Sequence, residues 1–171
     1  MQTYKNNTEH LLAEMAWVDL LIRREVETFR AESDGPQGVL RGLYISDSDV
    51  DRLLDSTKAE ANASDELFRQ AANLSHEAES RKEATLAEGT LLALPHMARL
   101  FSLSRFEQHL VLLALAPEID SRYERLFGYL HDDISRRRVT AGLALRLLCH
   151  TREQRLDALN LFSPQATLFR T

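Results

Sequence analysis

The chain has 171 residues, of which 44% are apolar and 27% are charged, with a formal net charge of -5. This mixture is typical of a soluble globular protein, and no segment provides the roughly 20 consecutive apolar residues that a membrane-spanning helix needs. The charge argues against a globally basic surface for nucleic acid. Because the N-terminus, MQTYKNNTEH, lacks the basic region and apolar core of a signal peptide, we expect a cytoplasmic protein.

Charge is spread unevenly along the chain. Residues 1–94 hold 10 Lys and Arg against 18 Asp and Glu, whereas residues 95–171 hold 11 against 8. The second half is therefore weakly basic and leaves room for a local basic patch. The single cysteine, Cys149, cannot form an internal disulfide, and its apolar neighbours predict a small buried residue.

The first predicted helix follows Thr8 and runs for about six turns. One face carries apolar residues at helical spacing: Leu11, Met15, Val18, Ile22, Val26 and Phe29. A second apolar patch around Trp17 lies on roughly the opposite side. We expect a second helix of the same chain to cover Trp17; the alternative is a subunit or partner contact, which makes Trp17 a candidate contact residue.

The segment that follows the first helix has glycine and proline punctuation. It predicts a short extended piece at residues 43–45 and a helix that begins at Ser46. The alternating acids Asp47, Asp49 and Asp51 resemble the start of a calcium loop. The glycine and glutamate that such a loop requires are replaced by Arg52 and Lys58, so a solvated first helical turn is the better interpretation.

Residues 57–88 predict one long, largely exposed helix, because they are rich in Ala, Glu and Lys and have no proline or glycine before Gly89. Its second half has few apolar anchors, which leaves fraying or disorder as an alternative.

Five short helices are predicted beyond Pro95. N-terminal capping residues mark four of them: Ser104, Ser121, Thr140 and Thr151. The segment QHLVLLALAPEID contains a run of seven apolar residues, Leu110 to Ala116, stopped by a proline. Because this run is apolar on every side, we expect it to be the central helix of the bundle.

The predicted fold is therefore all-α: a long N-terminal helix and a long second helix packed on a bundle of short helices. We divide the chain into a long-helix region, residues 1–94, and a compact bundle, residues 95–171, that together form one structural unit.

Catalytic motifs are missing from the sequence. It contains no GxxxxGK[ST], GxGxxG, HExxH or GxSxG, and no two of its six histidines stand three or four residues apart. The adjacent Asp132 and Asp133 are more typical of a turn than of a metal site. We expect no enzyme activity, no cofactor and no metal in this chain.

The strongest local charge feature is Arg136, Arg137 and Arg138, in a predicted loop after short helices. Such a pattern is compatible with a helix-turn-helix, in which Thr140 to His150 would be the recognition helix. Arg146 is the only long polar side chain in the middle of that helix, whereas reading base edges needs several. We therefore favour the three arginines as a contact for an acidic protein, or as a solvated loop, over phosphate binding.

Several segments together resemble the N-terminal region of bacterial AAA+ ATPases that are encoded with phage-tail-like contractile injection systems. They are GLYIS after the long helix, LFSLSRFEQHLVLLALAPEID, SRYERLFGYLHDD, VTAGLALRLL and FSPQATLF. The resemblance is strongest from Leu100 to Leu148, and residues 57–90 match no part of it. It implies a winged-helix-like domain, here with a truncated or absent wing.

The resemblance also implies a function. The domain would recruit substrates or position a hexameric motor at the injection machine by contacting protein partners, an injection-system component or its cargo. The family continues into an ATPase module that binds ATP and Mg, so we expect this chain to be one domain of a longer protein. The rival hypothesis is a free-standing winged-helix transcription regulator that binds DNA.

Overall fold

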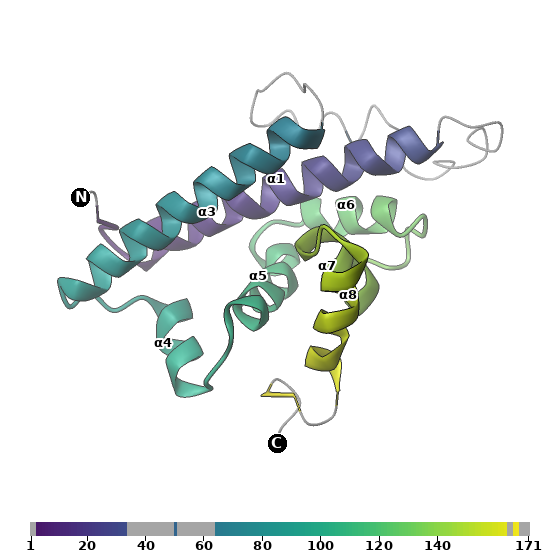
Figure 1. Cartoon of the computed structure of the whole chain (residues 1–171). Helices are drawn as coiled ribbons and strands as arrows, with labels where there is room; N and C mark the ends of the chain where they lie inside the picture. Colours follow the sequence, from purple (N-terminus) through teal and green to yellow (C-terminus); the bar gives the residue numbers. More distant parts are fainter. Residues whose placement is uncertain (1–2, 34–49, 51–63, 164–165, 168–171) are drawn as a thin grey trace.

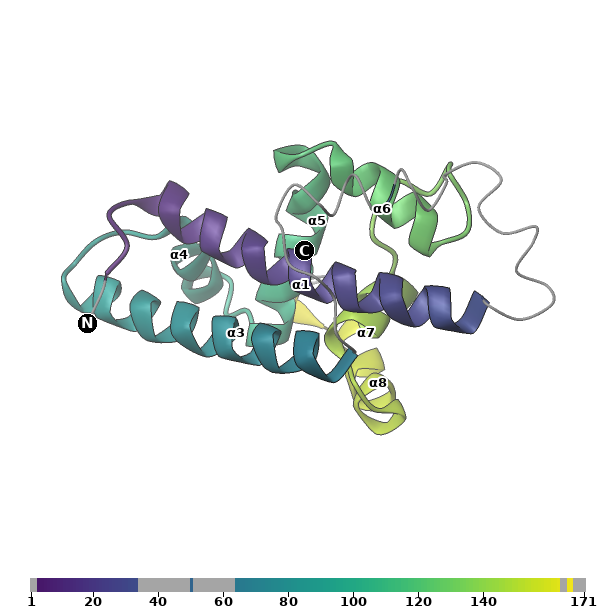
Figure 2. The same cartoon turned by 90° about the horizontal axis from the view of Figure 1, so that it is seen from above.

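The computed structural model describes residues 3–33, 50, 64–163 and 166–167. Two long helices, α1 (Asn7–Ser33) and α3 (Ser64–Ala87), run antiparallel and side by side (Figures 1 and 2). The short helices lie on one side of this pair. The described residues contain helices and no strand, which confirms the predicted all-α fold. The short extended piece expected at residues 43–45 and most of the helix expected to begin at Ser46 lie outside the described ranges.

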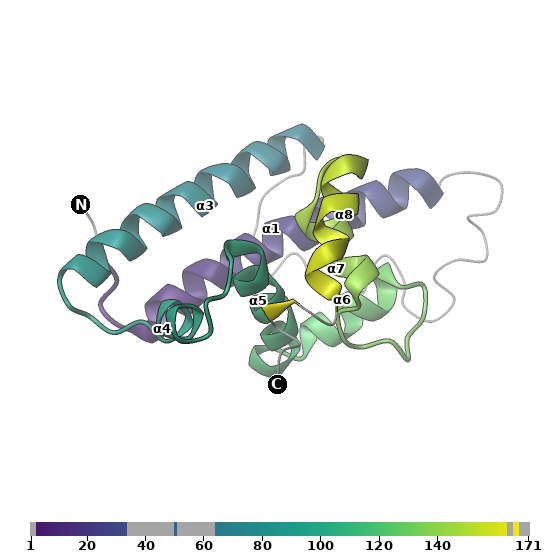
Figure 3. The ribbon, with the colours of Figure 1, turned by 60° about the horizontal axis from the view of Figure 1, so that its bottom comes forward.

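Five short α-helices and a 3-10 helix follow the long pair. In chain order they are α4 (Ala93–Leu100), α5 (Arg105–Ile119), α6 (Arg122–Leu130), α7 (Ala141–Leu148), α8 (Arg152–Ala158) and η2 (Leu159–Phe162). Figure 3 shows α4 at one end, α6 to α8 at the other, and α5 between them. Each helix among these described residues is too short or too polar to span a lipid bilayer.

Helix α1 is the centre of the molecule, since it contacts α3, α5, α6 and α7. Six consecutive residues, 21–26, are buried, so the helix is surrounded on every side there. The apolar core around α1 draws residues from both halves of the chain, including Ile22, Ala71, Leu113, Phe127 and Leu147. The division at residue 94 stays a prediction.

Helix α5 lies between the other short helices, as expected for a central helix (Figure 3), but it is not covered on every side. Leu112, Leu113 and Ala116 are buried, but Ala114 and Leu115 on the other side are exposed. The helix also continues past Pro117, the proline that was expected to stop it. Pro117 lies in the last turn, and the helix ends two residues later at Ile119.

Three of the four predicted caps are confirmed. Ser104 and Thr151 form capping boxes with Glu107 and Gln154, and the Thr140 hydroxyl accepts from the backbone N–H of Leu143. Ser121 makes no side-chain cap. Its backbone is already helical, and the Asp120 carboxylate accepts the Arg122 N–H at 2.9 Å instead.

Polar contacts tie the short helices to α1. The Tyr123 hydroxyl and the Arg122 guanidinium of α6 both donate to the carboxylate of Asp19, each at 2.6 Å. Burial, together with the hydrogen bond to Asp19, raises the pKa of Tyr123. Just before α1 begins, Tyr4 donates its backbone N–H to the Thr85 hydroxyl of α3 at 2.8 Å. The second half of α3 is a continuous helix to Ala87, so the fraying alternative does not describe it.

We predict that Leu113→Asp destabilises the protein far more than Leu86→Asp. Leu113 is fully buried, so an aspartate there would place an unpaired charge in the core at a cost of about 4 kcal/mol or more. Leu86 is 41% exposed, and its replacement should lower the free energy of unfolding by less than about 1 kcal/mol. Urea unfolding of the two variants measures this difference, and equal losses would contradict the burial order.

Candidate protein-contact surface

Helix α7, the segment that corresponds to a recognition helix, is held at its C-terminal end by a buried arginine from α1. The Arg24 guanidinium donates to the backbone carbonyls of Arg146 and Leu147 at 3.1 and 2.7 Å, and lies 3.0 Å from His150 Nδ1. Arg24 is only 7% exposed. A buried cation at the C-terminus of a helix satisfies terminal carbonyls and interacts favourably with the helix dipole.

The one long polar side chain of α7, Arg146 in its last turn, pairs with groups of the neighbouring helices, although it is 37% exposed. Arg146 Nε lies 2.9 Å from a carboxylate oxygen of Glu25 in α1, and its Nη2 donates to the Leu130 carbonyl at the end of α6 at 2.7 Å. The guanidinium therefore joins α1, α6 and α7 rather than being free for a ligand.

The exposed side of α7 carries small residues. Thr140, Ala141 and Gly142 are exposed, whereas Leu143, Ala144, Leu145 and Leu147 are buried. A helix that reads base edges presents several hydrogen-bonding side chains to the major groove. The first turn of α7 presents a hydroxyl, which already caps the helix, and a methyl group.

Thr140 and Ala141 open onto an apolar groove of about 290 Å³, which we call the α5–α7 groove. Its lining combines the open side of α5, the start of α7 and one residue of η2: Leu110, Val111, Ala114, Val139, Thr140, Ala141, Ala144 and Phe162. Every lining side chain is apolar except that of Thr140, which carries a hydroxyl. The groove can bind apolar side chains but offers no group for catalysis.

The three arginines of the candidate site lie in the loop that precedes this groove, since Val139 and Thr140 follow them directly. Their side chains are 63%, 65% and 58% exposed. Each pairs with an acid of the same chain: Arg136 with Asp133 at 3.2 Å, Arg137 with Glu124 at 3.7 Å, and Arg138 with Glu118. The loop is accessible, and its positive charge is balanced locally.

The adjacent acids at the start of this loop form a turn. Asp132 has a positive φ of 53° just after α6, a conformation that aspartate tolerates. Asp133 accepts from the hydroxyl and the backbone N–H of Ser135, and these hydrogen bonds lower its pKa. Within the described ranges, no group of three or more His, Cys, Asp or Glu side chains could hold a metal ion.

Trp17, the fourth candidate contact residue, lies in the interior. It is 7% exposed, and its ring centroid is 4.2 Å from that of His109 in α5. Burial lowers the pKa of His109 to about 4, so a neutral imidazole packs on the indole at physiological pH. Another helix of the same chain therefore covers Trp17, as expected. Because Trp17 is buried, it does not share an exposed surface with the three arginines.

Sequence reasoning missed both Arg24 and the α5–α7 groove. No local motif marks Arg24, because its partners lie more than 120 residues away. The groove had a signal in the sequence: a helix that is apolar on every side needs more covering surface than short neighbours supply.

We predict that replacing Arg136, Arg137 and Arg138 together with Ser changes stability less than the single change Arg24→Ser. Exposed ion pairs contribute little, so the triple variant should lie within about 1 kcal/mol of the wild type. Removing Arg24 leaves buried carbonyls of α7 unpaired and should cost about 3 kcal/mol. Thermal unfolding of both variants tests this, and a larger loss in the triple variant would refute our description of the loop.

A comparison of the sequence with protein families identifies the family of this chain. The family described as "Winged helix domain, variant" matches residues 1–171. No curated protein and no solved structure matches the chain. Winged helix domains are typically non-catalytic, and membership indicates a role in DNA binding or protein interaction. The chain belongs to the winged helix domain family in its variant form.

Proposed function

We propose that this chain is a protein-interaction module that belongs to a hexameric AAA+ ATPase of a phage-tail-like contractile injection system. In that motor it recruits substrates or positions the ATPase at the injection machine. The observation that carries the interaction role is the composition of α7: its one arginine is paired with Glu25 and the Leu130 carbonyl, and its small exposed residues Thr140 and Ala141 open onto the apolar α5–α7 groove.

The partner of this surface is a protein segment with apolar side chains beside acidic ones. Its apolar side chains occupy the α5–α7 groove, and its carboxylates compete with Asp133, Glu124 and Glu118 for Arg136, Arg137 and Arg138. A protein ligand gains free energy from burying apolar area in the groove. DNA offers phosphates and polar base edges, which gain little free energy from contact with an apolar groove.

The motor context rests on the sequence resemblance, which covers Leu100 to Leu148 most closely. In the motor, ATP and Mg would bind a separate ATPase module that also forms the hexamer, and the whole assembly would work in the cytoplasm. The reading frame of the gene tests this part: a phosphate-loop motif within a few hundred residues downstream supports the motor.

A DNA-binding regulator is the second candidate. The exposure of Arg136, Arg137 and Arg138 favours it, because exposed arginines in a loop next to α7 could contact phosphates. The charge balance of the loop and the small exposed residues of α7 weigh against it.

We predict that Ala114→Arg together with Ala141→Arg abolishes partner binding by the full-length protein without unfolding it. Both alanines are exposed and line the groove, so two long charged side chains would occupy the space that apolar groups of the partner need. Recovery of an injection-system component or cargo after affinity purification from producing cells should fall at least about tenfold, the effect of a 1.4 kcal/mol loss.

The matched control is Ala72→Arg, which adds the same side chain at an exposed position of α3. It should retain the partner. Equal loss in the control, or equal recovery with the groove variant, would show that the α5–α7 groove is not the contact; recovery of DNA in place of protein would support the regulator.

A further inference from the structure

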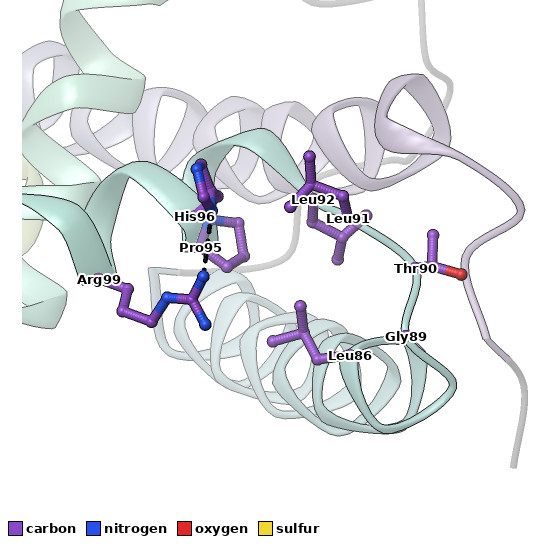
Figure 4. A pocket seen from close by; sticks show the side chains of 8 residues that line it. All are labelled: Leu86, Gly89, Thr90, Leu91, Leu92, Pro95, His96 and Arg99. Carbon is purple, nitrogen blue, oxygen red and sulfur yellow. Dashed lines mark hydrogen bonds between the residues drawn. The ribbon is translucent and has the colours of Figure 1, made fainter.

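A second groove lies at the other end of the molecule, between the C-terminal end of α3 and helix α4. Its volume is about 320 Å³, and we call it the α3–α4 groove. Figure 4 shows the side chains that line it: Leu86, Thr90, Leu91, Leu92, Pro95, His96 and Arg99, with Gly89 at the turn. Leu86 and Leu91 are 41% and 67% exposed, so the rim offers apolar surface to solvent.

The walls of this groove are fixed by local hydrogen bonds. Gly89 has a φ of +81°, and its N–H donates to the Leu86 carbonyl at 3.0 Å while the Thr90 N–H donates to the Thr85 carbonyl at 3.3 Å. This pattern is a Schellman motif, which ends α3 and turns the chain toward α4. Leu92 is fully buried, and anchors the segment between the two helices. A partner therefore meets a preformed site and loses little free energy in ordering it.

The charged group of the α3–α4 groove is Arg99. Its Nη2 lies 3.3 Å from His96 Nδ1, which orients the guanidinium over the groove beside Pro95, as Figure 4 shows. In the part of the chain that the structure describes, no carboxylate lies within ion-pair distance of Arg99, in contrast to Arg136, Arg137 and Arg138. Its remaining N–H donors can bind a carboxylate in a bidentate manner.

The surroundings limit the number of acids that the site accepts. Two exposed acids lie nearby in the chain: Glu83 in the last turns of α3, and Glu88 just after the helix ends, beside Gly89. A run of acids or a nucleic-acid backbone would meet repulsion from these two carboxylates, whereas a single carboxylate on Arg99 would not.

We propose that the α3–α4 groove is a second, separate docking site, for a protein segment that carries apolar side chains on either side of a single carboxylate. The apolar side chains contact Leu86, Leu91 and Pro95, and the carboxylate binds Arg99. This site does not depend on the α5–α7 groove, and a failure of the proposed function would leave it unaffected.

The test uses a combinatorial library of amidated decapeptides with apolar residues at fixed positions and Glu, Gln or Lys in the centre. Fluorescence-based selection on the whole chain should enrich Glu-centred peptides at least about tenfold over Lys-centred ones, since a charge-assisted hydrogen bond contributes about 1.5–3 kcal/mol. Arg99→Gln should abolish the preference for Glu, and Leu91→Ser should weaken binding of every selected peptide.

Two exposed residues far from the groove provide matched controls. Arg125→Gln in α6 and Leu156→Ser in α8 make the same chemical changes at exposed positions, and should leave peptide binding unchanged. The proposal is overturned if no peptide binds with a Kd below about 1 mM, or if the Glu and Lys peptides bind equally. It is also overturned if the control changes weaken binding as the groove changes do, or if a second copy of the chain covers the groove.

Discussion

The burial of two charged residues within α1 is the constraint on which the arrangement of the short helices depends. Arg24 and Glu25 are 7% and 8% exposed, in the middle of a helix that is surrounded on every side. Burying charge is unfavourable unless each group is paired and hydrogen-bonded. Arg24 finds its partners at the end of α7, and Glu25 finds Arg146, which in turn binds the end of α6. Helices α6 and α7 are therefore fixed relative to α1 by directional contacts as well as by apolar packing.

This network also determines which side of α7 faces solvent. The exposed first turn carries small side chains, and these continue the open apolar side of α5. The one arginine of the helix lies in the last turn and is paired with Glu25. The exposed side of α7 therefore has few of the polar groups that a DNA-reading helix would need. The arginine loop beside it adds charge that acidic partner residues can use.

Local features were predictable from the sequence because their physical causes are local. The caps at Ser104, Thr140 and Thr151 follow from spacing alone, and so do the helices that they begin. Ser121 was predicted wrongly because Asp120, one residue earlier, provides a competing carboxylate in better position. The family resemblance predicted the winged-helix class, which the family match supports.

Features that depend on long-range packing were not predictable. Helical periodicity predicts that Arg24 and Glu25 lie on the surface, and their burial follows only from the positions of α6 and α7. The run in α5 is apolar on every side, so its pattern cannot indicate which side the remaining helices leave open. The α5–α7 groove arises from this choice. The burial of Trp17 under another helix was expected from the sequence, but its partner in α5, His109, was not.

The most direct test of a protein-binding rather than a DNA-reading α7 is the affinity of the chain for duplex DNA, measured by fluorescence anisotropy over a range of salt concentrations. The account predicts no duplex binding that depends on Arg136, Arg137 and Arg138 at a physiological ionic strength of about 0.15 M. Binding that falls by roughly one log unit in K per log unit of salt for each phosphate neutralised, and that disappears when these three arginines are replaced by Ser, would contradict it.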